Sequence, residues 1–213
     1  ARAEKAIKEA KAKAIELLEQ RKRDLDKWDK PTQDSFHAWF GTLKEHDKKK
    51  IRERIVNAIS KLQKLRVENF VAEPRPTRKA GESARHYHDR LADYATDFAF
   101  VNPDKRRGKY EMTVHVGPLF NGQKVNGHFQ ATDATTRAGT LIHEVSHFFS
   151  VQDTEDVESC AILRKQMAPD KPKTMDDCRV YGPAAAKELA QRWPHMAMIN
   201  ADNFEFFVER RAP

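Results

Sequence analysis

Residues 139–151, GTLIHEVSHFFSV, contain two histidines four positions apart, with a glutamate directly after the first. On a helix, positions i and i+4 lie on the same face, so the imidazoles of His143 and His147 can point at one metal ion. Zinc bound there would lower the pKa of a water molecule toward about 7, and Glu144 could take the proton from that water. The HExxH pattern therefore predicts a zinc-dependent hydrolase, although a core helix that carries two histidines fits the same short pattern.

Several carboxylates could complete such a site, because a catalytic zinc ion usually takes three protein ligands and leaves one position open. Four candidates follow the second histidine within a few residues: Asp153, Glu155, Asp156 and Glu158. The apolar residues around HExxH favour a metal site over a plain core helix, since unpaired histidines and a glutamate are costly to bury. The spacing by itself does not choose among the four carboxylates.

Two further histidine positions carry weaker signals. HYH at residues 86–88 places two histidines on one side of an extended segment, and we interpret it as a solvated loop rather than a second metal site. His115 lies on an expected strand, and we interpret it as a strand histidine rather than a metal ligand, although that strand could pair with the backbone of a substrate.

The elements that must position this chemistry follow from hydrophobic periodicity. Apolar spacing predicts helices over residues 3–28, 46–69, 137–151, 183–193 and 200–211. DFAFV (97–101) and the alternating YEMTVHV (110–116) predict strands, whereas 34–41 is expected to form an aromatic turn closed by Gly41 and 72–83 a loop. We therefore expect an α+β fold, mainly helical, with a small β-sheet beside the HExxH helix.

Composition limits the function classes. The 213 residues carry a net charge of +7, and residues 1–80 hold 22 Lys/Arg against 13 Asp/Glu. A basic helical module that binds nucleic acid is therefore one alternative, although the interleaved acids favour a solvated helix surface. The chain contains no apolar run of the roughly 18 residues that a membrane span needs. Because it begins at Ala1, we expect a mature form or a fragment, with any export signal outside it.

Four motifs resemble one family when they are taken in order. RAGTLIHEVSHF (137–148), DTED (153–156), YGPAAAKELA (181–190) and NADNFEFF (200–207) are similar to motifs of the aspzincin metallopeptidases, the deuterolysins and peptidyl-Lys metalloendopeptidases. The resemblance implies a zincin-like fold and a zinc cofactor. It also implies that His143, His147 and Asp156 are the zinc ligands.

The same resemblance implies roles for the remaining site residues. Glu144 matches the general base, and Tyr181 matches the tyrosine that donates to the oxyanion of the tetrahedral intermediate. Asp202 and Glu205 match acidic positions that, in the lysine-specific members, line the pocket for the residue after the cleaved bond. Their i, i+3 spacing puts both on one side of a helical turn, but acidic residues are also favoured in the first turn of any helix.

The chain departs from the family pattern in two places. Asp153 stands where the family turn usually has glycine, and residues 157–180 form an insertion before Tyr181. The insertion contains both cysteines, and a Cys160–Cys178 disulfide would bring its ends together. The cysteine pairs of secreted fungal members are missing, which points to a bacterial member or a toxin-like domain.

We therefore expect residues 1–213 to form a single metallopeptidase domain, with an N-terminal helical part (1–71) and a catalytic part (97–213). Its expected function is zinc-dependent cleavage of proteins or peptides before lysine. We expect a monomer that does not bind nucleic acid and that is secreted or delivered outside the producing cell. The alternative is a toxin or effector domain with the same chemistry and a narrow target.

Overall fold

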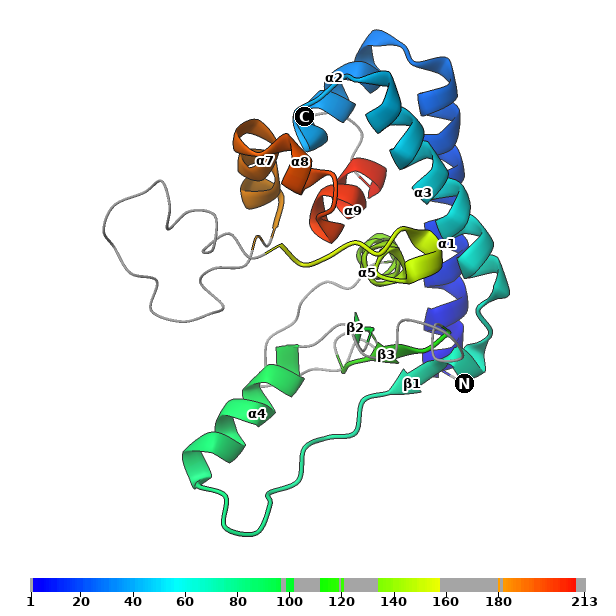
Figure 1. The fold of residues 1–213 in the computed structure, drawn as a ribbon. Coiled ribbons are helices and arrows are strands. Elements are labelled where there is room, and N and C mark those ends of the chain that lie inside the picture. Colours follow the sequence, from blue (N-terminus) through cyan, green and yellow to red (C-terminus); the bar gives the residue numbers. More distant parts are fainter. Residues whose placement is uncertain are drawn as a thin grey trace, which may run out of the picture.

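The computed structural model describes residues 2–96, 99–101, 112–118, 120, 134–157, 180 and 182–209. Eight α-helices lie within them (Figure 1): α1 (Arg2–Lys27), α2 (Lys30–Phe40), α3 (Glu45–Lys64), α4 (Ala84–Thr96), α5 (Ala134–Ser146), α7 (Gly182–Arg192), α8 (Pro194–Ala197) and α9 (Ala201–Glu209). Two short 3-10 turns occur at η1 (Val67–Asn69) and η4 (Phe149–Val151). The predicted α+β class with a dominant helical part is confirmed.

A small sheet completes the architecture of the described residues. Its strands are β1 (Phe70–Ala72), β2 (Ala99–Phe100) and β3 (Val114–Val116), in the order β1-β3-β2. β1 runs parallel to β3, and β2 pairs with β3 antiparallel. β2 also contacts α5, so the sheet lies beside the HExxH helix, as expected from the sequence (Figure 1).

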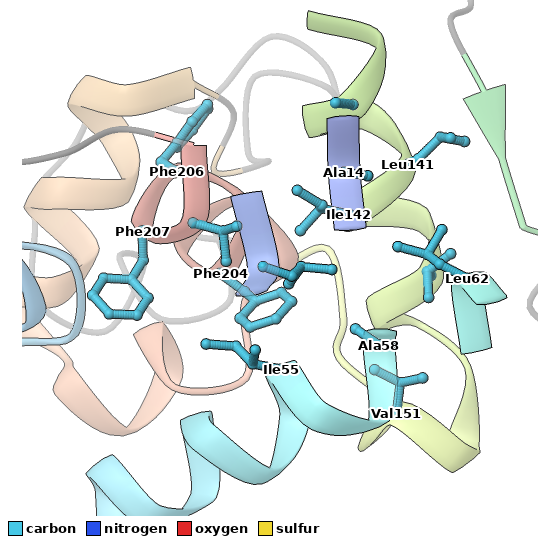
Figure 2. Close-up of a cluster of buried hydrophobic side chains, with 14 of the residues drawn as sticks. Ala14, Ile55, Ala58, Leu62, Leu141, Ile142, Val151, Phe204, Phe206 and Phe207 are labelled. Carbon is cyan, nitrogen blue, oxygen red and sulfur yellow. The ribbon is translucent and has the colours of Figure 1, made fainter. Parts of the chain in front are cut away.

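α5 lies at the centre of the helical layer. It packs against α1 and α3 on one side and α9 on another (Figure 1). Alanines on α1 allow the close approach, because Ala10 and Ala14 are fully buried and keep the helices near each other. Figure 2 shows part of the resulting core, including Ile55, Leu62, Leu141, Ile142, Phe204 and Phe207. The N-terminal helices are therefore part of the wall behind α5.

The aromatic segment before Gly41 is a helix, so the prediction of a turn over 34–41 was wrong. The Asp29 side chain caps α2 by accepting from the backbone N–H of Thr32, at 3.1 Å. Pro31 lies in the first turn, where a missing N–H does no harm. Gly41 ends the helix with φ 66°, and a Cβ there would lie 1.9 Å from the carbonyl oxygen of Ala190. Proline therefore begins this helix rather than only ending the one before it.

Other segments also differ from the prediction. The strand expected over 110–116 begins only at Val114 in the described residues. The HYH residues belong to α4 and are helical rather than extended. The third helix ends at Lys64, and η1 and β1 follow it where helix was expected to 69. α5 ends at Ser146 rather than near 151, because the chain turns to bring the next segment back beside the helix. Residues 73–83, which follow β1, contain no helix or strand, as the prediction of a loop requires.

One continuous core joins the two expected parts of the chain. It contains residues from α1, α2 and α3 as well as from the sheet, α5 and α9. This shared core supports the single domain over 1–213, which we keep as a proposal. Among the described helices, none is long and apolar enough to cross a membrane.

An asparagine network ties α9 to its neighbours. Asn203 is fully buried, and its Nδ2 donates to the carbonyls of Trp39 and Ala186 at 2.6 and 2.8 Å. Its Oδ1 accepts from Asn200 Nδ2 at 2.7 Å. One side chain therefore satisfies polar groups of α2, α7 and the start of α9.

Replacing Asn203 with alanine is expected to lower the free energy of unfolding by about 2–4 kcal/mol, because it removes three buried hydrogen bonds. Chemical denaturation of the chelator-treated protein measures the change. Asn57→Ala on α3 is the control, and we expect it to stay within about 0.5 kcal/mol of the parent. A loss for Asn203→Ala no larger than that of the control would contradict the structural role.

Candidate metal centre

The HExxH residues lie where α5 leaves the core. Leu141, Ile142 and Val145 are fully buried and hold one face of the helix against α1, α3 and α9. The opposite face carries His143 and Glu144, and His147 follows the last helical residue, Ser146. Both histidines and the glutamate are more than half buried, so their positions are set by packing.

Asp156 contacts both imidazoles. Its Oδ1 lies 3.0 Å from His143 Nε2 and 3.5 Å from His147 Nε2. The centroids of the two imidazole rings are 5.0 Å apart, and the ring planes are inclined at 79°. Donor atoms that bind one zinc ion tetrahedrally at about 2.0–2.1 Å lie roughly 3.3 Å apart, and the two observed spacings fall on either side of that value. The three predicted ligands are therefore brought together with their donor atoms converging.

The other carboxylate candidates are placed differently. The Glu155 side chain is exposed, and its backbone forms a bridge to residues on either side of Asn200. Asp153 lies in the turn itself, with φ 51°. Glu158 is outside the described residues.

The turn before Asp156 reverses the chain beside α5. Gln152 and Asp153 both have positive φ, at 92° and 51°. Aspartate is among the residues that enter the left-handed region most readily, so Asp153 can serve where the family turn usually has glycine. Thr154 N then donates to the Ser146 carbonyl at 3.0 Å and locks the reversed segment onto the helix.

A second layer of oxygens holds the two histidines. His147 Nδ1 lies 2.7 Å from the backbone carbonyl of Thr154. Because a carbonyl only accepts, Nδ1 carries the proton and Nε2 is left for a metal. Thr154 was not among the site residues predicted from the sequence, and only its place eight residues beyond Ser146, after a tight turn, could have pointed to it.

His143 is held from α9. Its Nδ1 lies 3.0 Å from Asp202 Oδ1 and 3.3 Å from Glu205 Oε2. Asp202 also accepts from Gly182 N through Oδ2, at 2.7 Å. Both carboxylates predicted to line a substrate pocket are thus partners of a metal-ligand candidate, a contact that the sequence analysis did not anticipate. Tyr181 and the Cys160–Cys178 pair lie outside the described residues.

The electrostatics of the cluster suit a cation. Burial alone would lower the pKa of His143, but the carboxylates of Asp156, Asp202 and Glu205 raise it well above its usual value. Burial also raises the pKa of Glu144 to about 8, an effect that the nearby His143 opposes and Asp156 adds to. The ligand atoms of His143, Glu144 and His147 lie within 4.8 Å of one another. Two imidazole nitrogens and a carboxylate, backed by further carboxylates, fit a divalent metal ion.

Known proteins match this chain in sequence and in fold. Residues 26–175 match the aspzincin family model, described as lysine-specific metallo-endopeptidase. An extracellular protease of Aeromonas hydrophila is 36% identical over 112 residues, which are 53% of this chain and 23% of that protein. A peptidyl-Lys metalloendopeptidase of Armillaria mellea is 37% identical over 78 residues, 37% of this chain and 16% of that protein. The aligned segments thus span less than a quarter of either relative.

A solved structure supports the fold independently. A zinc peptidase from Grifola frondosa superposes with a TM-score of 0.61 at 22% sequence identity, over 97% of this chain and 93% of that one. The zincin-like fold expected from the motifs is therefore confirmed. Since the family model covers more than half of the sequence and includes the HExxH helix and Asp156, the chain belongs to the aspzincin family of lysine-specific metallo-endopeptidases.

Proposed function

We propose that this chain is a zinc-dependent endopeptidase that hydrolyses peptide bonds in proteins or peptides. The observation that carries the proposal is the convergence of His143 Nε2, His147 Nε2 and Asp156 Oδ1 beside Glu144. Membership of a metallo-endopeptidase family supports the same chemistry. Asp156 is 37% exposed, so the cluster is open to solvent on the side where a substrate would approach.

His143, His147 and Asp156 would hold the zinc ion in this proposal. Bound zinc supplies a Lewis acid that polarises the peptide carbonyl and makes water more acidic. Glu144 takes a proton from the attacking water as a carboxylate and returns it to the leaving amine as an acid. Burial raises the pKa of Glu144, and a cation bound beside it would lower that pKa again and favour the carboxylate that accepts the proton. Tyr181 remains the proposed oxyanion donor on the strength of the family resemblance.

We further propose that Asp202 and Glu205 select lysine after the cleaved bond. Their side chains are 8% and 16% exposed and lie together beside His143. Two carboxylates in a poorly hydrated position attract an ammonium group strongly. The same carboxylates would orient His143, so one pair of side chains would serve the metal ligand and the substrate.

Export from the producing cell is also a proposal, supported by the Aeromonas relative named as an extracellular protease. The toxin or effector alternative and the monomeric state stay predictions. A nucleic-acid-binding function would not account for the cluster of His143, His147 and Asp156, so we do not favour it.

Replacing Glu144 with glutamine is expected to reduce kcat/KM for cleavage of a denatured protein by roughly 100- to 10,000-fold, because the general base is lost. Bound zinc should stay near one equivalent, since Glu144 is not a proposed ligand. Metal analysis and a cleavage assay on the same sample measure both quantities. Glu188→Gln, on the exposed face of α7, is the control. Cleavage that persists in Glu144→Gln would remove Glu144 from this role.

Asp156→Ala should weaken zinc binding by more than tenfold, because one of three proposed protein ligands is lost. Competition with a chelator of known affinity measures the change. Its neighbour provides a matched control: Glu155→Ala removes an exposed carboxylate from the same turn and should leave the affinity unchanged. Equal losses for the two variants would show that general charge, rather than ligation by Asp156, holds the metal.

The proposed lysine preference predicts the pattern of cleavage in a denatured protein. Mass spectrometry of the fragments should find lysine at most new N-termini, because its ammonium group meets Asp202 and Glu205. Glu205→Gln should reduce the preference for lysine over neutral residues while cleavage continues. Scattered cuts by the parent protein would leave the zinc chemistry intact and remove the selective role of the two carboxylates.

A further inference from the structure

A glycine stands on the HExxH helix one turn before the first histidine. Gly139 and His143 are four positions apart on α5 and therefore lie on the same face. Among the residues, only proline is a poorer helix former than glycine. A glycine at this place weakens the very helix that must hold the site, so its missing side chain requires an explanation.

The space that a side chain would take at residue 139 is filled by carboxylates of α9. A Cβ built on Gly139 would lie 2.6 Å from Glu209 Cδ and 2.7 Å from the Oε1 atoms of both Glu205 and Glu209. Real Cβ atoms essentially never come so close to other heavy atoms. Glu205 and Glu209 are four residues apart on α9 and present the same face to α5.

The contact reaches the metal centre through one carboxylate. Glu205 lies beside Gly139 with Oε1 and beside His143 Nδ1 with Oε2, at 3.3 Å from the latter. It thus spans one helical turn of α5, from the glycine to the histidine. A methyl group at residue 139 would push this carboxylate away from the helix, together with the carboxylate of Glu209, which lies equally close to the same position.

We propose that Gly139 is a positioning residue of the metal centre. Its missing Cβ lets Glu205, beside Glu209, lie close against α5 and hold the imidazole of His143. This inference deepens the proposed function, on which it rests, by assigning a residue that supports the metal ligand without touching the metal or substrate. The clashing atoms are the ends of flexible side chains, so an added methyl group would displace the carboxylates rather than the helix.

Gly139→Ala tests the proposal through two measured quantities, zinc affinity and thermal stability, which we expect to respond differently. Zinc affinity, measured by chelator competition, should fall by roughly 10- to 100-fold, as is typical when a partner of a metal ligand is lost. The midpoint of thermal unfolding of the zinc-free protein should stay the same or rise, because alanine favours helix. Unchanged zinc affinity would overturn the proposal, and so would a variant that fails to fold.

A double-mutant cycle with Glu205 separates positioning from a general packing effect. Glu205→Ala alone should weaken zinc binding to a similar degree, and adding Gly139→Ala should then change the affinity by less than about twofold. Full, independent losses from the two substitutions would show that Gly139 does not act through Glu205. Failure of the proposed function can be told apart from failure of this inference. If the proposed function is wrong, the parent protein cleaves no peptide, but its zinc affinity and the double-mutant cycle can still be measured.

Discussion

The need to satisfy polar atoms on a buried helix is the constraint on which the rest of this structure depends. α5 is anchored in the core by its apolar face, so His143 and Glu144 on the helix, and His147 directly after it, lie where unpaired polar groups are costly. Each imidazole Nδ1 meets an oxygen from outside the helix, the Thr154 carbonyl for His147 and α9 carboxylates for His143. Those contacts turn both Nε2 atoms toward Asp156.

The segment that carries Asp156 depends in turn on the asparagines before and within α9. Glu155 N donates to the Ile199 carbonyl, and Ala201 N donates to the Glu155 carbonyl. Asn200 Oδ1 accepts from Val157 N at 3.1 Å and so holds the far end of the same segment. Because the asparagine network continues to Trp39 of α2 and Ala186 of α7, these two helices support the third ligand candidate from a distance.

α9 is therefore more than a covering helix. Its apolar residues, among them Phe204 and Phe207, pack into the core (Figure 2). Its carboxylates Asp202 and Glu205 contact His143 of α5. The same helix that completes the core thus sets the charge around His143. Gly139 is the complementary feature on α5, because it leaves room for Glu205 at the surface where the two helices meet.

The order of motifs along the chain was enough to identify the family and the mainly helical class, because HExxH, the acidic turn, the Tyr-Gly pair and the Asn-Ala-Asp-Asn segment are local patterns. Secondary structure was harder to predict where the same residues are common in two kinds of element. Pro31 could end one helix or begin the next, and HYH could belong to a loop or to a helix such as α4.

The sequence by itself determined which residue types are available for the chemistry: two imidazoles four positions apart and a glutamate between them, with several carboxylates downstream. Spacing alone did not distinguish Asp156 from Glu155. The family resemblance pointed to Asp156, and the tertiary structure turns its carboxylate toward both imidazoles after the backbone reversal at Asp153. It also decided that Asp202 meets His143, since contacts between residues far apart in sequence arise from helix packing. Spacing along a chain carries no information about such contacts until the helices are placed against each other.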